Sequence, residues 1–560
     1  MSVGFFSLFI NALMLVPTFY MLQVYGRVVT GGSLTTLAML TIILTFLLVT
    51  MGLLEWVRSR IMVRVSTRLD VLLGRDVYRA SFKRALDSGG QDASAQPLSD
   101  LTGLRQFMSG NGLFAFFDAP WLPIYVAVLF LFHPWFGWTA IGCAVILLAL
   151  AIINEQSTGK VLAAANKESI GSTLQTNKNL RNAEVIESMG MLDSLMSRWS
   201  LRHKKVLLLQ SRASDRSGII TSISKTFRLL VQSLILGLGA YLAVSHEINA
   251  GLVIAGSVLL GRALAPLDLM IGSWKGFIAA RSQYARLNGI LDQQKAEPER
   301  MQLPAPIGHV TVENLTLGAP GAKTAIIKGI GFNAPAGAMI GVVGPSASGK
   351  STLAKALVGV WKPQHGVVRL DTADIANWDK SQLGPHLGYL PQDIELFEGT
   401  ISDNIARFGV VDPDKVVLAA RTASVHEMIL MLPDGYDTVI GEGGINLSGG
   451  QRQRIGLARA IYGSPRLIVL DEPNAHLDEV GERALALALQ QIKLTGATVF
   501  VIAHRTSILA QLDRLLVMNA GTISLYGPRD QVLAQLNANQ LAAQQKPAAR
   551  AGTEVASTEV

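Results

Sequence analysis

A glycine-rich segment in the second half of the chain has the residue types that hold the phosphates of a nucleotide. Its sequence is GPSASGKST, and it lies between a short apolar run, Ala338–Val343, and a helix-like run, Ser351–Gly359. In a strand, loop and helix setting, backbone N–H groups and the positive end of the helix attract phosphate. We expect Lys350 to pair with the β and γ phosphates of ATP and the Ser351 hydroxyl to ligate Mg²⁺. The predicted ATP-binding residues are Gly344, Pro345, Ser346, Ala347, Ser348, Gly349, Lys350, Ser351 and Thr352.

Two adjacent acidic residues have the positions expected of a metal ligand and a general base. Asp471 and Glu472 follow a continuous apolar run, Arg466–Leu470, which indicates a buried strand. At the end of a parallel strand beside a phosphate loop, one carboxylate can hold Mg²⁺ and the next can polarise the attacking water. We assign Asp471 to the metal and Glu472 to general-base catalysis. The alternative, two surface acids that end a strand, is disfavoured by the spacing to the other motifs.

A second helix start with small residues precedes the acidic pair. Ser448, Gly449 and Gly450 lie directly before a helix-like run, Gln451–Tyr462. They therefore form another candidate anion site at a helix N-terminus.

Together these segments resemble the nucleotide-binding domain of ABC transporters, over about residues 307–535. The resemblance implies that Gln392 is a metal ligand that also senses coupling, that His504 contacts the γ-phosphate, and that both act in catalysis with Glu472. The matching segments, in the family's order, are the phosphate loop, Gln392 in YLPQD, LSGGQRQR from Leu447, Asp471 with Glu472, Asp478 in NAHLD and His504 in VFVIAH.

The resemblance also implies a homodimer. In this family each ATP lies between the phosphate loop of one subunit and the signature of the other, head to tail. Asp478 and Glu442, the latter in TVIGEGG, are the implied interface residues. Because Glu472 and His504 are both present, both ATP sites of the homodimer are expected to hydrolyse ATP. The signature residues are Leu447, Ser448, Gly449, Gly450 and Gln451.

Two positions depart from the family pattern. Aligning Val312–Gly321 with the family puts Ala319 where an aromatic residue usually stacks on adenine. We therefore expect adenine stacking to be weakened or supplied elsewhere. His476 lies in the interface loop at a position that is often apolar or neutral, and we interpret it as tolerated variation.

The composition indicates a chain that is partly embedded in a membrane. Its 560 residues exceed what one core usually supports, so at least two domains are expected. A mean hydropathy of +0.35 with 16% charged residues is too apolar for an ordinary soluble protein. The net charge of +8 comes from dispersed cations without an aromatic-basic platform, so no nucleic-acid partner is expected. The single cysteine, Cys143, excludes an intrachain disulfide and indicates a small buried side chain.

Six apolar stretches approach the roughly 20 helical residues that a bilayer crossing needs. The third contains Asp118, Pro120 and Pro123, and the fifth is short. The predicted spans are about residues 3–24, 35–57, 112–132, 135–154, 229–245 and 250–273.

Basic residues place the long connections in the cytoplasm. Arginines from Arg60 to Arg79 follow span two at helical steps, which predicts a helix continuing straight out of the span, whereas the short connections carry only Arg27 as a cation. Because cations near span ends favour the cytoplasm, we place both long connections and both termini there. Their tips, near 97–104 and 181–191, are where we expect mechanical coupling.

The predicted fold is a membrane all-α domain of six helices followed by an α/β phosphate-loop domain. We expect the membrane domain over 1–290, a proline-containing linker over 291–306, the ATPase domain over 307–540 and a disordered tail over 541–560.

Arg262 lies near the middle of span six, and an intramembrane charge usually faces a cavity or a partner. It either lines a translocation path, pairs with Asp268 or Asp118, or lies near the cytoplasmic side. Asn11 and Asp118 are assigned to helix packing or helix ends.

Three longer segments are similar to the protease and lipase exporters of type I secretion: NALMLVPTFYMLQVYGRVV, FFDAPWLPIYVAVLFLFHPWFG, and RALAPLD followed by SWKGFIAAR. This resemblance implies ATP-driven export of an unfolded polypeptide with an uncleaved C-terminal signal across the inner membrane of a Gram-negative bacterium. The implied partners are a periplasmic membrane-fusion protein, an outer-membrane channel and membrane lipid. No peptidase domain precedes the spans, so leader cleavage is not expected.

Two alternatives stay open. A lipid or drug exporter would have the same ATPase and would differ in what stimulates hydrolysis. A membrane-anchored ATPase that regulates another channel without transporting would also carry these motifs.

Overall fold

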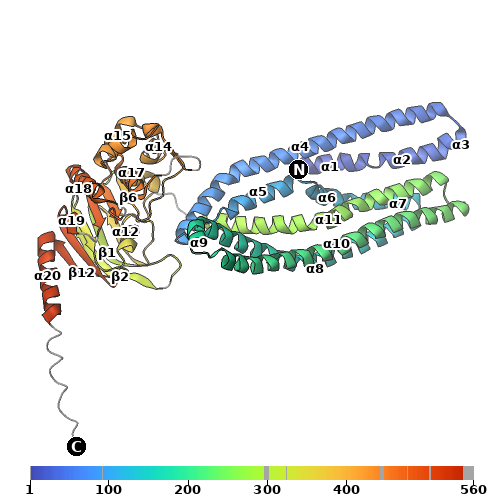
Figure 1. Ribbon diagram of the computed structural model, residues 1–560. Coiled ribbons are helices and arrows are strands. Elements are labelled where there is room, and N and C mark those ends of the chain that lie inside the picture. Colours follow the sequence, from blue (N-terminus) through green and yellow to red (C-terminus); the bar gives the residue numbers. More distant parts are fainter. Residues whose placement is uncertain are drawn as a thin grey trace, which may run out of the picture. The chain divides into compact units, whose positions relative to one another are not determined.

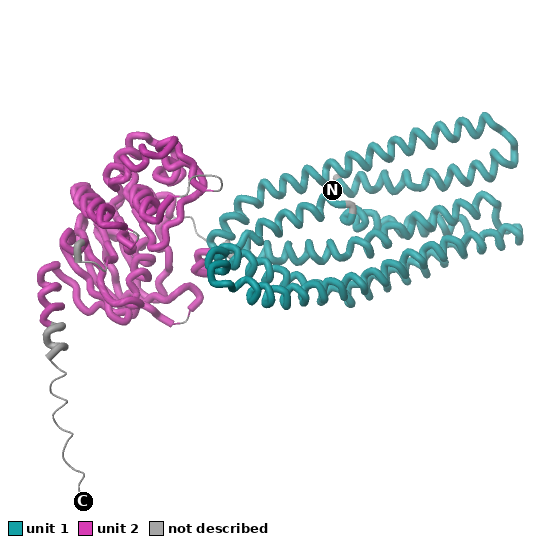
Figure 2. The backbone as a smooth tube through the Cα atoms, in the orientation of Figure 1, with its two compact units in different colours: residues 1–84, 93–296 teal, residues 85–92, 297–560 magenta. Residues whose placement is uncertain are grey.

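The computed structural model describes residues 2–90, 93–294, 302–322, 324–441, 447–475, 477–503 and 506–545 (Figure 1). Its contacts divide the chain into two units (Figure 2). Residues 1–84 and 93–296 form a helical unit, and residues 85–92 and 297–560 form an α/β unit.

Within the described residues, six helical segments are long and apolar enough to cross a membrane, as predicted. Two of them are built from pieces, because Pro17 and Pro120 each lie in the first turn of a new helical piece. The first span comprises α1 (Ser2–Leu13), α2 (Val16–Gln23), the π-helical η1 (Val24–Val28) and α3 (Val29–Gly31). The third comprises α6 (Asn111–Asp118), η2 (Ala119–Trp121) and α7 (Leu122–Phe132).

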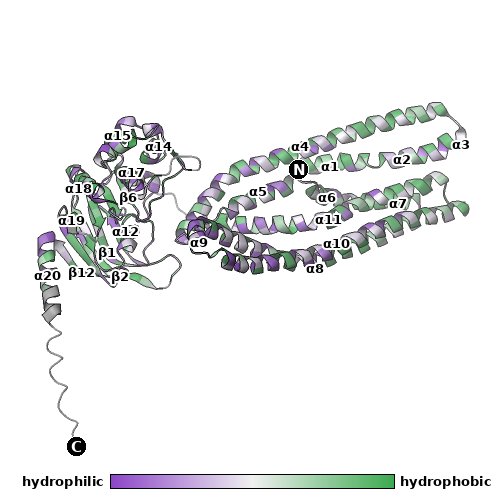
Figure 3. Ribbon diagram, in the orientation of Figure 1, coloured by the Kyte–Doolittle hydropathy of each residue, from purple (hydrophilic) through white to green (hydrophobic). Residues whose placement is uncertain are grey.

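The other four spans are parts of much longer helices, namely α4 (Leu34–Asp87), α8 (Pro134–Arg181), α10 (Leu192–Val244) and α11 (Ala250–Gln294). Helix α4 has 54 residues, which is about 80 Å at 1.5 Å per residue, well over the roughly 30 Å hydrocarbon core. The helix predicted from the arginine spacing is therefore present. Polar residues gather on the parts of α8 and α10 near α9 (Ala183–Ser188), and apolar ones toward α7 (Figure 3). Helix α5 (Gln96–Ser109) precedes the third span.

Close packing around Phe136 joins α8, α10 and α11. Its ring is fully buried, and a Cβ built on Gly256 would lie 2.8 Å from it. Gly239 is equally restricted, since a Cβ there would lie 2.9 Å from the Val253 side chain. Cys143 belongs to the same core, which agrees with its interpretation as a small buried side chain.

The α/β unit has a six-stranded sheet in the order β12-β11-β3-β10-β9-β6. All neighbours are parallel except β12 with β11. Because the central strands are covered on both faces, β9 and β10 are buried at every residue. For β9 this was predicted from the continuous apolar run Arg466–Leu470. The strands are β3 (Met339–Val343), β6 (Leu387–Leu390), β9 (Leu467–Asp471), β10 (Thr498–Ile502), β11 (Arg514–Asn519) and β12 (Thr522–Pro528).

A second, antiparallel sheet has the order β2-β1-β4-β5, and β7 pairs with β8. Helix α12 (Lys350–Leu357) shares one core with this second sheet and one face of the larger sheet. The second-sheet strands are β1 (Val310–Gly318), β2 (Ala325–Ala334), β4 (His365–Leu370) and β5 (Ala373–Asp374), and the short pair is β7 (Gly399–Thr400) with β8 (Val439–Ile440).

Helix α13 (Lys380–Leu383), which contributes Leu383 to the first core, is followed by η3 (Gly384–His386). The other helices form a second core against the other face of the larger sheet. They are α14 (Ile401–Ile405), α15 (Pro413–Thr422), α16 (His426–Leu430), η4 (Gly435–Asp437), α17 (Gly449–Ile461), α18 (Glu479–Leu494), α19 (Thr506–Leu509) and α20 (Arg529–Gln545). Helix α20 runs past the predicted domain end at residue 540. Residues 295–301 of the predicted linker and 546–560 of the predicted tail lie outside the described residues.

Candidate active site

The glycine-rich segment forms a tight loop between β3 and α12. Gly344, Ala347 and Gly349 have φ values of 154°, 64° and 99°, which residues other than glycine rarely adopt. A Cβ on Gly344 would lie 2.2 Å from the carbonyl oxygen of Met518, so only glycine fits there. The loop thus brings backbone N–H groups to the start of α12, where the helix dipole favours an anion.

Lys350 is held inside this loop. Its ammonium group donates hydrogen bonds to the carbonyl oxygens of Gly344 and Pro345 at 2.9 and 2.8 Å. Burial lowers the pKa of Lys350, and the carboxylates of Glu472 and Asp471 oppose that change. The lysine is therefore a cation placed among hydrogen-bond acceptors, in the position where phosphate oxygens could take their place.

Ser351 and Asp471 meet between the first turn of α12 and the end of β9. The Ser351 hydroxyl donates to the Asp471 carboxylate at 3.2 Å. Burial raises the pKa of Asp471, and the charge of Glu472 adds to that effect, while the hydrogen bond from Ser351 opposes it. A buried carboxylate beside a hydroxyl supplies the hard oxygen ligands that Mg²⁺ prefers.

Glu472 and Gln392 close the other side of the loop. The Gln392 amide donates to the Glu472 carboxylate at 3.2 Å, and Gln453 on α17 donates to the Glu472 carbonyl at 3.2 Å. Glu472 has a φ of 50°, a backbone conformation that surrounding contacts must impose on a residue other than glycine. A cavity of about 460 Å³ lies here, lined by Ile326, Ser346, Ala347, Gly349, Lys350, Ser351, Thr352, Gln392 and Glu472.

The signature residues lie elsewhere on the α/β unit. Ser448 caps α17, because its hydroxyl accepts from the N–H of Gln451 at 3.2 Å and its own N–H donates to the Gln451 side chain at 2.8 Å. Gly449 and Gly450 form the first turn, and Leu447 is buried beside them. None of these five residues lines the cavity at the phosphate loop. Within the described part of a single chain, the signature and the phosphate loop therefore do not line the same cavity.

The other predicted interface and phosphate contacts are only partly described. Asp478 caps α18 and accepts a hydrogen bond from the N–H of Gly481 at 2.7 Å. Glu442, His476 and His504 lie outside the described residues. Ala319 follows β1 in a turn, where its carbonyl accepts from the N–H of Ala322.

The structure adds two residues that sequence reasoning missed. Ile326 on β2 lines the cavity and approaches Gly349, where a Cβ would lie 3.5 Å from its side chain. Tyr389 on β6 has its pKa raised to about 12 by burial, with a further contribution from the charge of Asp471. Ile326 lies in no motif, and an apolar residue in a strand carries no sequence signal for a binding role. Tyr389 begins the YLPQD segment, but only Gln392 in that segment was given a role from the sequence.

In the helical unit, the proposed ion pair of Arg262 with Asp118 or Asp268 is wrong. Asp118 pairs with Arg58 at 2.9 Å, and Asp268 pairs with Arg228 at 2.7 Å and also accepts from Ser224. Arg262 instead donates to the Met14 carbonyl at 3.4 Å. Its role in a translocation path stays a prediction.

Asn11 and Asp118 join helices, in agreement with their assignment to packing. The Asn11 amide donates to Asp118 at 3.0 Å, and the buried Tyr125 hydroxyl donates to the Asn11 side chain at 2.9 Å. These bonds tie the first span to the third.

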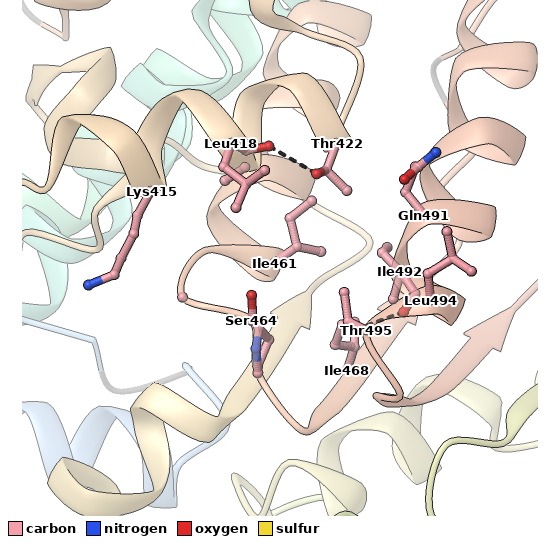
Figure 4. A pocket seen from close by; sticks show the side chains of 13 residues that line it. Lys415, Leu418, Thr422, Ile461, Ser464, Ile468, Gln491, Ile492, Leu494 and Thr495 are labelled. Carbon is pink, nitrogen blue, oxygen red and sulfur yellow. Dashed lines mark hydrogen bonds between the residues drawn. The ribbon is translucent and has the colours of Figure 1, made fainter.

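A second cavity, of about 410 Å³, lies among α15, the end of α17 and α18. Figure 4 shows Leu418, Ile461, Ile468 and Ile492 around it. It shares no lining residue with the cavity at the phosphate loop. We assign no chemistry to it.

A phosphate loop, an Asp–Glu strand end and a capped glycine-rich helix, on a chain with six membrane-spanning helices, define a membrane transporter with its own ATP-binding domain. The comparisons agree: residues 327–475 match the ABC transporter family, and residues 1–267 match the ABC transporter transmembrane region.

Relatives of known role match along most of the chain. The type I secretion system ATP-binding protein PrsD of Rhizobium meliloti (strain 1021) is 43% identical over 96% of this chain and 92% of its own length. The leukotoxin translocation ATP-binding protein LktB of Mannheimia haemolytica is 27% identical over 95% of this chain and 76% of its own length. The structure of a bacterial Atm1-family ABC exporter with ATP bound shares the fold, with a TM-score of 0.81, 22% identity and 98% coverage of both chains.

The chain therefore belongs to the ABC transporters, in the group of type I secretion ATP-binding proteins. It couples ATP hydrolysis to transport and lies in the inner membrane. The predicted family, fold class and location are confirmed.

Proposed function

We propose that the chain uses ATP to export an unfolded polypeptide through a type I secretion system, as a homodimer with a periplasmic membrane-fusion protein and an outer-membrane channel. The sequence similarity to PrsD and LktB supports the polypeptide substrate. The observation that carries the enzymatic part is the contact between Gln392 and Glu472 at 3.2 Å, on the cavity that also contains Lys350 and Ser351.

In this proposal each residue at the phosphate loop has one task. Lys350 and the loop N–H groups bind the β and γ phosphates. Ser351, Asp471 and the Gln392 side-chain oxygen hold Mg²⁺, which they fit as hard oxygen donors; when bound, the metal neutralises phosphate charge. The Glu472 carboxylate orients the attacking water and accepts its proton.

The proposed assembly follows from the separation of the signature from the phosphate loop. Ser448, Gly449 and Gly450 form the capped start of α17, where Ser448 is exposed and the two glycines are half-buried. They line no part of the cavity in their own subunit. A second subunit placed head to tail supplies the missing anion site, with Asp478, Glu442 and His504 at the interface. Two ATP molecules are then bound between two chains.

The central test separates transport from hydrolysis. In inside-out vesicles with the complete chain, Glu472→Gln should bind ATP and lose both hydrolysis and uptake of a labelled polypeptide. Uptake that persists in this variant would contradict ATP-driven export. Hydrolysis without any uptake in wild-type vesicles would favour a regulatory ATPase.

The substrate class is tested by stimulation. A C-terminal fragment of a secreted protease should change the wild-type ATPase rate, whereas the same fragment with scrambled sequence should not. If lipids or amphipathic drugs change the rate and such fragments do not, the chain is a lipid or drug exporter.

A further inference from the structure

Arg407 occupies an unusual backbone position directly after α14. Its φ is 57°, and that of Phe408 is 56°. A left-handed conformation is unfavourable for a residue other than glycine, so two in succession require strong surrounding contacts. The backbone here is shaped to direct the Arg407 side chain inward.

The Arg407 guanidinium donates four hydrogen bonds, and all four acceptors are backbone carbonyls. Two are at the C-terminal end of α17, on Arg459 and Ala460, at 3.0 and 2.9 Å. The other two are on Gly384, the first residue of η3, and on Leu387, the first residue of β6, at 2.7 and 3.0 Å. One planar group thus joins the end of a helix to the start of a strand.

The charge of Arg407 is balanced by these dipoles. Burial, with the nearby charge of Arg459, lowers the pKa of Arg407 to about 10, so it stays protonated at neutral pH. A cation at a helix C-terminus is favourable, because the unpaired carbonyls carry partial negative charge. Lysine, with three donors on a point charge, could satisfy only part of this arrangement.

The two elements that Arg407 joins carry the two halves of the proposed catalytic machinery. Helix α17 begins at the signature cap, Ser448, and β6 leads to Gln392. Two further hydrogen bonds hold the segment that follows Gln392. Arg459 on α17 donates to the Glu395 carbonyl at 3.1 Å, and Asn404 on α14 donates to the Phe397 carbonyl at 2.8 Å.

We propose that Arg407 is a positioning residue that fixes the signature helix relative to the strand of Gln392, so that the signature reaches a partner's ATP when Gln392 is in place. This inference rests on the proposed function of both motifs. Helix α17 has 13 residues, about 20 Å, so a tilt of about 3° at its C-terminal end moves the signature by about 1 Å. Misplacement of that size can cost about 10²-fold in rate.

The test replaces Arg407 with Met, which keeps the length and removes all donors, and with Lys. Arg407→Met should leave the Kd for ATP within about threefold, because the phosphate loop is untouched, and lower kcat by about tenfold or more. Arg407→Lys should fall between, with kcat lowered about threefold to tenfold. The matched control is Arg529→Met, which removes one exposed guanidinium bonded to the Ala510 carbonyl and should leave kcat unchanged.

Three results would overturn the assignment: an unchanged kcat per folded molecule with only a lower melting temperature, an equal loss of ATP affinity and kcat, or an unchanged kcat in Arg407→Lys. If Arg407→Met does not fold, the kcat of Arg407→Lys alone decides between these outcomes. Glu472→Gln, measured beside these variants, separates the two claims. If it keeps hydrolysing ATP, the proposed function fails; if it is inactive while the Arg407 variants are normal, only the positioning role fails.

Discussion

Gln392 donates its amide N–H to the carboxylate of Glu472 at 3.2 Å, and so two segments far apart in the sequence meet on one cavity. Gln392 follows β6 and Glu472 follows β9, and these strands are parallel neighbours. Parallel strands end at the same edge of a sheet, which is why an amide and a carboxylate that end them lie within hydrogen-bonding distance.

This contact predicts the behaviour of Gln392→Ala. Loss of the amide should lower kcat by about 10²-fold, because the proposed base loses the group that orients it, while the Kd for ATP changes little. Phosphate release and nucleotide binding, measured on the same preparation, check both statements. The control is Gln382→Ala, which removes a half-buried amide that accepts from the Leu303 N–H and lines no part of the cavity. An unchanged kcat in Gln392→Ala would contradict the role.

When Mg²⁺ is absent from the solution, Asp471→Asn should raise the free energy of unfolding. Burial raises the pKa of Asp471, so the protonated form is favoured by folding, and that stability is lost as pH rises through the folded-state pKa. The variant should therefore match wild type at low pH and be more stable by roughly 1 kcal/mol near pH 8. Thermal unfolding over pH measures this. The control variant is Asp530→Asn, at an exposed carboxylate on α20.

The same Asp471→Asn variant tests the metal assignment. Mg²⁺ with ATP should raise the melting temperature of wild type more than ATP alone, because a ligand that binds only the folded state stabilises it. In the variant the two melting temperatures should agree. An equal Mg²⁺ effect in both proteins would remove Asp471 from the metal site.

Ala319→Tyr should strengthen ATP binding if adenine lies over the turn after β1. An aromatic stack contributes about 1 kcal/mol, which corresponds to about fivefold in Kd. The Kd values for ATP and for ribose triphosphate without the adenine base, compared by titration, distinguish stacking from phosphate binding. Ala322→Tyr, in the same turn, is the control. Unchanged ATP affinity in Ala319→Tyr would place the base elsewhere.

The buried pair of Arg58 and Asp118 joins α4 to the third span in the helical unit. Asp118→Asn alone leaves a buried guanidinium without its carboxylate and should destabilise the protein by about 3–5 kcal/mol. Adding Arg58→Met should recover part of that loss, so the double variant should cost less than the sum of the two single variants. Unfolding in detergent measures the cycle. Additive losses would show that the pair contributes nothing specific.

Most of the fold was predictable because its signals are local. Six spans follow from apolar length, and the long extension of α4 follows from the arginine spacing at Arg60 to Arg79. The phosphate loop and the Asp471–Glu472 strand end were predictable because glycine, lysine and carboxylates occur there at fixed positions relative to a strand and a helix.

Pairing between distant residues was not predictable in the same way. Arg262 has Asp268 six positions away, yet Asp268 pairs with Arg228, because helix packing and not sequence distance sets which side chains meet. Arg407 carries no sequence signal, since a lone arginine in a turn gives no hint that four carbonyls surround it. The absence of the signature from the cavity of its own phosphate loop agrees with the expectation from the family resemblance that the two motifs meet across subunits.

The most direct test of completion of each ATP site across two subunits is a mixing experiment. Lys350→Ala disables the phosphate loop and leaves the signature intact, whereas Ser448→Arg disables the signature and leaves the phosphate loop intact. The homodimer of either variant should be inactive. In a 1:1 coexpression, half of the dimers are mixed and each mixed dimer has one intact site of two, so ATPase activity should recover to about a quarter of wild type. No recovery in purified mixed dimers, or full activity in the Ser448→Arg homodimer, would contradict assembly of the site from two chains.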